Sequence, residues 1–398
     1  MSSEEKFMFF NKNYSEERML LKECNLVDTR NMRVMQNVSI LIENGKIAAI
    51  GALDTDSVDA RTVSASGYTV TPGLIDAHVH LALSGKPDSH LSGENMYRAE
   101  QKAILCENLR LNLQNGITAV RDLGCRWELL DMMRELEQGS DVFTTVMACG
   151  PVCTIPDGHA TFFGEIVFPQ NMAAMIERLK SQGAEFVKII GTGGNLSPRT
   201  DCFDTQYTDD EFAEMMEFVI SAEMDAACHA HATAGIEQCM RYGVRSIEHG
   251  SYITEQQVHR LAQREDCFWV PTICPGRLIE NLSEAASDRV ARRRSMAKLA
   301  AGHGVNLVAG TDAGIGDVPH GCLPHELDEF TDAGMSPMRA LHSATHLAAV
   351  LMRKEGQIGV IEPGSAADIL FFNGDIESDG FSFHNPELII KGGCLVKT

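Results

Sequence analysis

The stretch "TPGLIDAHVHL", from Thr71 to Leu81, places two histidines directly after an apolar segment that opens with Pro-Gly. In a β-strand, residues two positions apart project to the same face. His78 and His80 therefore share one side at the end of the strand that this stretch predicts. Imidazole is a common ligand of divalent metals such as zinc, nickel and iron. The pair indicates part of a metal site, although two polar residues on a half-buried strand would explain this stretch alone equally well.

The same pattern, a short apolar run that ends in polar or small residues, recurs along the middle of the chain. Between several runs the sequence predicts helices: leucines recur at every fourth position before Gly116, and Thr208 with Glu211 forms a capping box. Eight alternations within roughly 280 residues favour a (β/α)₈ TIM barrel, an α/β fold, over a doubly wound sheet. No G-x-G-x-x-G or Walker sequence indicates a nucleotide fold. The seven further runs are "GITAVRDLG", "FTTVMACG", "AEFVKIIG", "DAACHAH", "VRSIEHG", "CFWVPT" and "VNLVAGTDAG".

Both ends of the chain have β character instead. In "NVSILIENGKIAAIGA", Asn44-Gly45 joins two apolar runs and predicts a type I′ hairpin. The tail "GQIGVIEPGSAADILFFNGD" has the same texture, with Pro363-Gly364 as its turn. We therefore expect residues 1–73 and 353–398 to form one small β-sandwich domain beside a barrel of residues 74–352.

The composition is ordinary for a soluble globular enzyme, and the charge bears on its partners more than on its substrate. Of the 398 residues 44% are hydrophobic and 22% charged, and the formal net charge is -21, which disfavours nucleic acids and anionic membranes as partners. The N-terminus lacks a basic region followed by a long apolar one, and about 18 consecutive apolar residues occur nowhere, so neither a secretory leader nor a transmembrane helix is expected. Twelve cysteines without a C-x-x-C pair suit reduced thiols in the cytoplasm. Whether the chain forms a homo-oligomer stays open.

Several predicted strands end in residues that can bind metal. Lys188 lies in "FVKII", "CHAH" ends the next run, "EHG" follows with His249, and "GTDAG" carries Asp312. Catalytic residues of TIM barrels lie at the carboxyl ends of the strands. The sequence therefore predicts that these side chains meet His78 and His80 in one site.

These motifs resemble the amidohydrolase superfamily, and in particular its binuclear-metal branch of Xaa-Pro dipeptidases (prolidase-like), carboxypeptidases and ochratoxin hydrolase. The likeness rests on "TPGLIDAHVHL", "VRDLG", "HAHATAGI", "SIEHGSY", "GTDAG" and "PGSAADIL", which follow one another in the order of that family. It implies a barrel plus a β-sandwich made from both chain ends, and two divalent ions, most often Zn²⁺. Carried over, His78, His80 and Asp312 would bind one ion, and His229 and His249 the other.

The resemblance also implies that Lys188 bridges the two ions as a carbamate formed with CO₂. An ammonium group only donates hydrogen bonds and cannot bind a cation. A lysine inside an apolar strand is shifted toward its neutral, nucleophilic form, and the carbamate then offers two anionic oxygens. An ion-paired or snorkelling lysine is the alternative for Lys188.

Other residues are candidates for substrate contact. His229 is assigned to the metal because it lies at the family's distance before His249, and His231, on the same face, is assigned to the substrate; a solvated loop histidine is its alternative. Tyr252 is a candidate donor to the substrate carbonyl, although a packed or surface tyrosine fits as well. His159, Arg199 and His320 lie in loops after predicted strands and are candidate substrate contacts; for Arg199 and His320 an ordinary exposed position is the alternative.

The expected chemistry is metal-assisted hydrolysis of an amide bond in a dipeptide or N-acyl amino acid with a free carboxylate. A water shared by the two ions would be the nucleophile, and Asp312, His231 and Tyr252 the catalytic side chains. A mononuclear deaminase is disfavoured because Ala232 stands where H-x-x-E would end and because Lys188 is present. An opener of cyclic amides resembling imidazolonepropionase stays open as an alternative. A barrel that serves only as a non-catalytic scaffold is the alternative of another class, although such relatives lose ligands and none is missing here.

Overall fold

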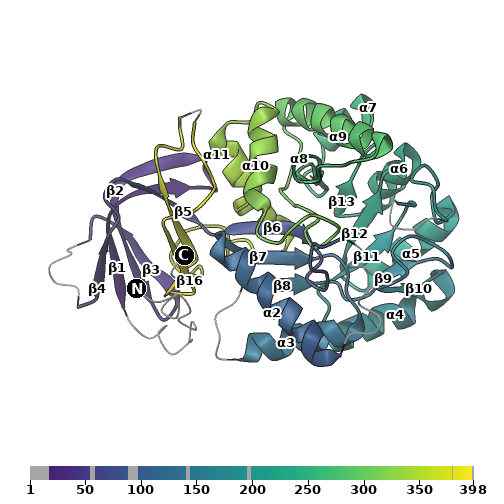
Figure 1. Cartoon of the computed structure of the whole chain (residues 1–398), viewed down its shortest axis with the longest axis horizontal. Coiled ribbons are helices and arrows are strands. Elements are labelled where there is room, and N and C mark those ends of the chain that lie inside the picture. Colours follow the sequence, from purple (N-terminus) through teal and green to yellow (C-terminus); the bar gives the residue numbers. More distant parts are fainter. Residues whose placement is uncertain are drawn as a thin grey trace.

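The computed structural model describes residues 18–53, 59–87, 97–139, 144–194, 199–378 and 380–396, and there a β-sheet domain lies beside a barrel. Figure 1 shows the purple strands of the N-terminal segment and the yellow strands of the C-terminal segment together in one domain. The barrel lies beside this domain. The first 17 residues, in which no secretory leader is predicted, lie outside the described residues.

Both ends of the chain build the β-sheet domain, as predicted. Its strand order is β17-β16-β15-β5-β1-β2-β3, with β4 paired to β1. The predicted hairpin is present: Asn44 and Gly45 have φ angles of 52° and 72°, and Glu43 pairs with Lys46 across the turn. The limits of the two domains stay a prediction. The strands are β1 (Met19–Asp28), β2 (Arg33–Glu43), β3 (Lys46–Gly51), β4 (Arg61–Ser64), β5 (Tyr68–Pro72), β15 (Ile369–Asn373), β16 (Leu388–Lys391) and β17 (Cys394–Val396).

The barrel consists of parallel strands in two ladders, β6-β7-β8 and β10-β9-β11-β12-β13-β14. The backbone N–H of Glu185 donates to the carbonyl of Ala148 at 3.0 Å and links the first ladder to the second. Two strands of three residues each, β9 and β10, were not predicted. The strands are β6 (Leu74–Val79), β7 (Ile117–Asp122), β8 (Thr145–Ala148), β9 (Val152–Thr154), β10 (Gly164–Ile166), β11 (Phe186–Ile190), β12 (Asp225–Ala230), β13 (Ser246–His249) and β14 (Phe268–Val270).

The eighth predicted strand, "VNLVAGTDAG", closes the barrel without forming a regular strand. Trp269 N–H donates to the Asn306 carbonyl at 2.9 Å, and Ala77 N–H donates to the Ala309 carbonyl at 3.1 Å. The segment thus lies between β14 and β6. At its end Asp312 has a φ of 64°, in the left-handed region, which takes the chain out of the extended conformation.

The helices confirm both predicted caps. The helix α2 ends before Gly116, whose φ is +80°, and the Thr208 side chain accepts a hydrogen bond from the backbone N–H of Glu211 at the start of α5. None of the helices in the described ranges has the length and apolar composition that a membrane crossing needs. The helices are α2 (Arg98–Gln114), α3 (Trp127–Gln138), α4 (Pro169–Gln182), α5 (Asp209–Ser221), α6 (Thr233–Tyr242), α7 (Glu255–Leu261), α8 (Pro275–Leu278), α9 (Glu284–His303), α10 (Leu323–Asp332), α11 (Pro337–Ser343) and α12 (His346–Leu351).

Every residue of the strands β6, β7, β11 and β13 is buried. Parallel strands covered on both faces are normally continuous apolar runs, because an unpaired charge in such a place costs free energy. Charged and polar side chains inside these strands therefore need a partner, and three of them, His78, Lys188 and His249, line one cavity of the barrel.

Candidate metal centre

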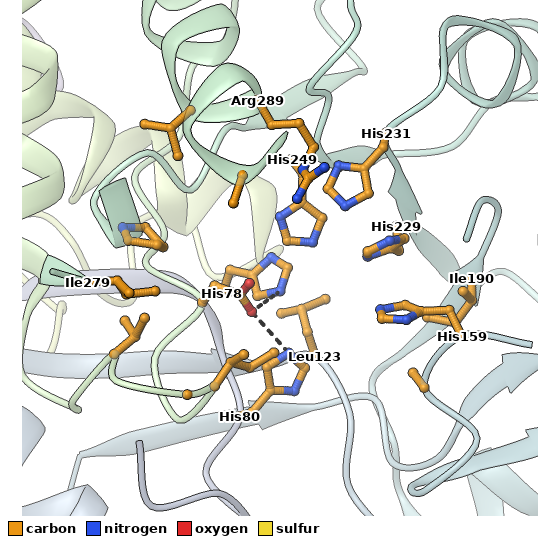
Figure 2. Close-up of a pocket in the computed structure, with 18 of the residues that line it drawn as sticks. His78, His80, Leu123, His159, Ile190, His229, His231, His249, Ile279 and Arg289 are labelled. Carbon is orange, nitrogen blue, oxygen red and sulfur yellow. Dashed lines mark ion pairs between the residues drawn. The ribbon is translucent and has the colours of Figure 1, made fainter. Parts of the chain in front are cut away.

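Six histidines, Lys188 and Asp312 line one cavity of about 250 Å³ at the carboxyl ends of the barrel strands. His78 lies on β6, Lys188 on β11 and His249 at the end of β13, and Asp312 follows the segment that closes the barrel. Figure 2 shows His78, His80, His159, His229, His231 and His249 around the same space. The structure therefore brings these residues together at the strand ends, as predicted.

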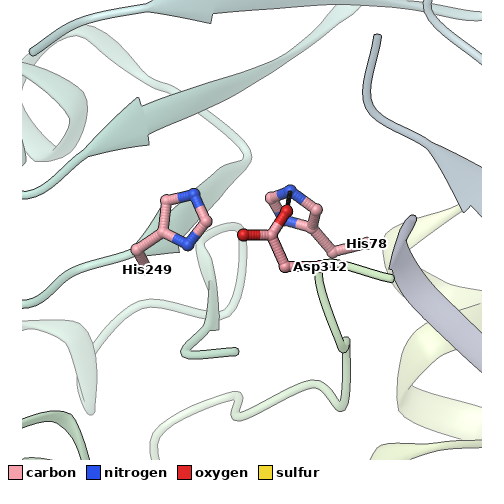
Figure 3. A group of neighbouring side chains, drawn as sticks. All are labelled: His78, His249 and Asp312. Carbon is pink, nitrogen blue, oxygen red and sulfur yellow. Dashed lines mark ion pairs between the residues drawn. The ribbon is translucent and has the colours of Figure 1, made fainter. Parts of the chain in front are cut away.

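Asp312 lies within reach of three of these histidines. Its Oδ1 atom is 3.4 Å from Nε2 of His78 and 3.3 Å from Nε2 of His80. Ligand atoms of His78, His249 and Asp312 all lie within 4.8 Å of one another (Figure 3). Asp312 Oδ1 is nevertheless buried and accepts no hydrogen bond from any of the described residues. A carboxylate oxygen that faces imidazole nitrogens and lacks a donor fits a divalent cation.

His249 lies between the two predicted ligand groups. Its ring centroid is 5.0 Å from that of His78 and 4.7 Å from that of His229. Its Nδ1 atom is 2.8 Å from Thr272 Oγ1, so Nε2 is the atom available to the cavity. In His229 it is Nε2 that is hydrogen-bonded, to the Gly193 carbonyl at 3.3 Å, which leaves Nδ1 available. Ligating histidines commonly use their second nitrogen in this way to fix the ring.

Glu248 holds His78 in place. Its Oε2 accepts from His78 Nδ1 at 2.7 Å, and Oε1 accepts from Arg121 at 3.2 Å and from Ser246 Oγ at 2.6 Å. Burial by itself would raise the pKa of Glu248, but the hydrogen bond from His78 and the charges of His78, Arg121 and Lys188 bring it down to about 2. The ionised carboxylate keeps the proton on Nδ1 and turns Nε2 of His78 toward Asp312. The sequence analysis missed Glu248 and Arg121, although a charge inside an apolar strand was a usable signal.

The histidines on β12 and β13 are held neutral. Burial, and then the neighbouring positive groups, keep the pKa values of His229, His231 and His249 well below the ordinary range. Burial likewise lowers the pKa of His159 to about 4. Neutral imidazole is the form that binds metal and accepts protons, so the set is ready for either role at neutral pH.

Lys188 is buried, with 2% of its area exposed, and lines the cavity. No hydrogen bond or ion pair of its amine is found within the described part of the chain. Burial lowers its pKa, which favours the neutral amine. A buried lysine without a partner is costly, so this position indicates a group with a chemical role.

The residues predicted to contact the substrate do not all lie in the cavity. His231 lines the cavity with Nδ1 fixed 2.8 Å from Ser251 Oγ, and His159 lines it with an unpartnered Nδ1 while its ring lies 4.6 Å from that of His229. Tyr252 does not line the cavity; its ring packs on Phe203 with centroids 4.5 Å apart. Its contact with substrate stays a prediction.

Two of the predicted substrate contacts lie elsewhere. The Arg199 side chain is 73% exposed and pairs with Asp157 at 2.6 Å. His320 is buried, but its Nε2 is 3.1 Å from the Leu83 carbonyl and its Nδ1 is 3.4 Å from Asn112 Nδ2. Neither lines the cavity. Their position after a predicted strand suggested contact with the substrate, but their interactions within the protein already account for both side chains.

Arg289 and Arg293 on α9 do line the cavity, and sequence reasoning missed them. They occur in "SDRVARRRSMAK", which has the appearance of an exposed basic helix face. The spacing of four between them, with Val290 and Ala297 on the buried side, is the only sequence signal.

A second group of possible metal ligands lies outside the cavity. His325, Asp328 and His384 are partly exposed, and Nε2 of His384 is 3.0 Å from Asp328 Oδ2. This group matters when bound metal is counted.

The sequence model of the amidohydrolase family matches residues 69–395. The chain is 24% identical over 416 residues to the ochratoxinase of Aspergillus niger, covering 91% of this chain and 83% of that protein. It is 26% identical over 411 residues to the imidazolonepropionase of Geobacillus kaustophilus (strain HTA426), covering 91% of each. Among solved structures it is similar to a Xaa-Pro dipeptidase with bound methionine in the active site, with a TM-score of 0.84, 25% identity and coverage of 96% and 100%.

Proposed function

The chain belongs to the amidohydrolase family, whose members are metal-dependent hydrolases of carbon–nitrogen bonds, and we propose that it cleaves the amide bond of a dipeptide or N-acyl amino acid with two bound metal ions. The convergence of His78, Lys188, His229, His249 and Asp312 on one cavity carries this proposal. The likeness to a Xaa-Pro dipeptidase and an ochratoxinase supports the substrate class.

In this proposal His78, His80 and Asp312 hold one ion, and His229 and His249 hold the other. The 3.3–3.4 Å distances from Asp312 to the first two histidines support the first set. The ring of His249 lies near both sets, which suits two ions close together. Zinc fits this mixture of imidazole and carboxylate ligands.

Lys188 completes the site as a carbamate. Its neutral amine attacks the carbon of CO₂ and loses a proton, which turns a donor into a group with two anionic oxygens. The absence of a hydrogen bond or ion pair for its amine, within the described residues, supports this step, because burial of the ammonium form outweighs the attraction of the Glu248 and Asp312 charges.

Bound divalent ions supply an activated water and polarise the scissile carbonyl. Asp312 then accepts the proton of the water and delivers it to the leaving nitrogen. His231, whose Nδ1 is fixed by Ser251, turns Nε2 to the substrate. Phe162 and Phe163 cover the other side, with their ring centroids 4.2 Å apart, and exclude water there.

A substrate screen tests this function. Metal-replete protein is expected to hydrolyse N-acyl amino acids and dipeptides faster than lactams and imidazolones, and addition of a chelator should abolish the activity. The likeness to imidazolonepropionase makes ring opening the second candidate. Faster turnover of cyclic amides than of every linear substrate would replace the proposal with that candidate, and absence of any amide hydrolysis would favour a non-catalytic barrel.

Metal analysis of two histidine variants tests the ligand assignment. His229→Asn is expected to lower the bound metal from two ions per chain to one, because Nδ1 of His229 is the free nitrogen beside His249. His231→Asn should keep both ions and lose turnover. Each count is compared with that of His384→Asn, which removes any ion held by the partly exposed group on α10. The reverse pattern at 229 and 231 would assign the metal to His231.

A further inference from the structure

Two arginines on one face of α9 are buried in the wall of the catalytic cavity. Arg289 is 6% exposed and Arg293 is 7% exposed, and their spacing of four places them on the same side of the helix. Figure 2 shows the Arg289 side chain pointing from α9 toward His249 and His231. A pair of buried guanidinium groups beside a metal centre calls for an explanation, because buried cations are normally matched by anions.

These arginines differ from their neighbours on the same helix. Arg292 pairs with Asp288 at 2.7 Å, and Arg294 pairs with Glu329 at 2.6 Å. Arg289 and Arg293, within the described residues, form no ion pair with a carboxylate. The arginines that face outward are thus paired within the protein, and those that face the cavity are not.

The hydrogen bonds of the two arginines are only partly made. Arg293 Nη1 donates to Thr272 Oγ1 at 3.1 Å, but its Nε atom is buried and has no acceptor. Arg289 acts on Tyr252, where it opposes the burial that raises the pKa of the phenol. Glu326, whose charge acts on Arg293, accepts instead from the backbone N–H groups of Ile273 and Cys274 at 3.0 and 2.6 Å. Donors therefore remain for a ligand.

From this arrangement we infer that Arg289 and Arg293 bind the free carboxylate of the substrate. The inference rests on the proposed function and names the residues that select its substrate class. Guanidinium is planar and binds a carboxylate through two parallel hydrogen bonds, which suits a single small anion. Burial lowers the pKa of Arg293 to about 10, so the group is still charged at neutral pH.

The position of the pair explains how the cavity orients its substrate. His231 and His249 adjoin the arginines, and the charges of Arg293 and Arg289 act on His231. Arg293 Nη1 and His249 Nδ1 both contact Thr272 Oγ1, at 3.1 and 2.8 Å, so a carboxylate on the arginines would lie close to an amide carbonyl at the metal ligands, as an N-acyl α-amino acid requires. The other walls are apolar, formed by Ile279, Leu282, Ile315 and Val318 and by the two phenylalanines, and take an uncharged side chain or acyl group.

Kinetics on matched acid and amide substrates test this assignment. The holoenzyme and the variants Arg289→Gln, Arg293→Gln and Arg293→Lys are compared on an N-acyl amino acid and on its C-terminal amide. Each Gln variant should lose about 10- to 100-fold in kcat/KM for the acid and little for the amide, because a charge-assisted hydrogen bond is lost only with the acid. The Lys variant should recover part of this selectivity. Arg294→Gln is the matched control and should change neither substrate, because its partner Glu329 keeps an ion pair with Arg277.

Equal losses on acid and amide would overturn the assignment, because a purely structural role affects both. Arg289→Gln is the cleaner variant, since Arg293 also contacts Thr272, which holds His249; metal content is measured for both. Calorimetry with benzoate and benzamide provides a second readout that needs no turnover. If the Gln variants bind benzoate more weakly and benzamide as before, the arginine pair is supported even when no amino-acid amide is hydrolysed. If the variants hydrolyse the substrates with unchanged acid selectivity and unchanged benzoate affinity, the arginine pair is rejected and the proposed function remains.

Discussion

Replacement of Lys188 by alanine is expected to abolish amide hydrolysis, with a loss of about 10³-fold or more in kcat, because metal-assisted stabilisation of the transition state is worth several kcal/mol and each 1.4 kcal/mol is tenfold. The lysine lies inside the fully buried strand β11 and faces the histidine ligands. In the proposed site, the variant would lack the carbamate that supplies an anionic ligand to the metal ions. Metal content and kcat are measured together on the purified variant.

Rescue and spectroscopy separate the carbamate from other roles of the lysine. A short carboxylic acid such as propionate can occupy the space left in Lys188→Ala and should restore part of the activity. Wild-type enzyme loaded with metal in ¹³C-bicarbonate should show a carbamate carbon signal that the variant lacks. A variant with full activity, or a wild-type enzyme without that signal, would contradict the proposal.

Lys391 provides a matched control. It is also a buried strand lysine, but its amine pairs with Asp368 at 2.7 Å and with Thr145 Oγ1 at 2.8 Å. Lys391→Ala should lower the free energy of unfolding, because it leaves Asp368 buried without its partner, and should leave kcat unchanged. Lys391→Ala is thus expected to show its effect in the stability measurement, and Lys188→Ala in the activity measurement.

The barrel and the meeting of the candidate ligands at its strand ends could be predicted from the sequence, because both follow from local rules. A parallel strand is a short apolar run, its end is marked by a polar residue, and the carboxyl ends of all strands meet on one side. His78, Lys188, His249 and Asp312 needed nothing more to be placed together. The hairpin at Asn44-Gly45 was equally local, since two left-handed residues select the turn.

Residues whose role depends on packing could not be predicted in the same way. Arg199 and His320 had the right chemistry after the right strands, yet one pairs with Asp157 on the surface and the other bonds to Leu83. Arg289 faces the cavity only because of the way α9 packs on the barrel. In the sequence, this helix has the pattern of an exposed basic surface. The orientation of a helix about its own axis is a tertiary property, and the three consecutive arginines at 292–294 hide it.

Replacement of Asp312 by asparagine should lower kcat by about 10³- to 10⁴-fold, near the upper end of what proton transfer by a positioned side chain contributes. The variant keeps an oxygen in place of Oδ1 but loses the charge and the basicity. The close approach of His78 and His80 outweighs the effect of burial and holds the pKa of Asp312 well below its usual range, so wild-type Asp312 is ionised at neutral pH. Asparagine removes that charge at every pH.

The backbone at this position decides which substitution is informative. Asp312 has a φ of 64°, a conformation that asparagine adopts more readily than alanine, so Asp312→Ala would add backbone strain to the loss of the carboxylate. Asp317→Asn is the matched control: it lies five residues further on, is exposed, and has a φ of 62°. It should retain wild-type kcat and metal content. If Asp312→Asn with both ions bound keeps more than about a tenth of wild-type kcat, proton transfer by Asp312 is excluded at the magnitude expected of a general base, and His231 or His159, the neutral imidazoles that face the same space, must take that role.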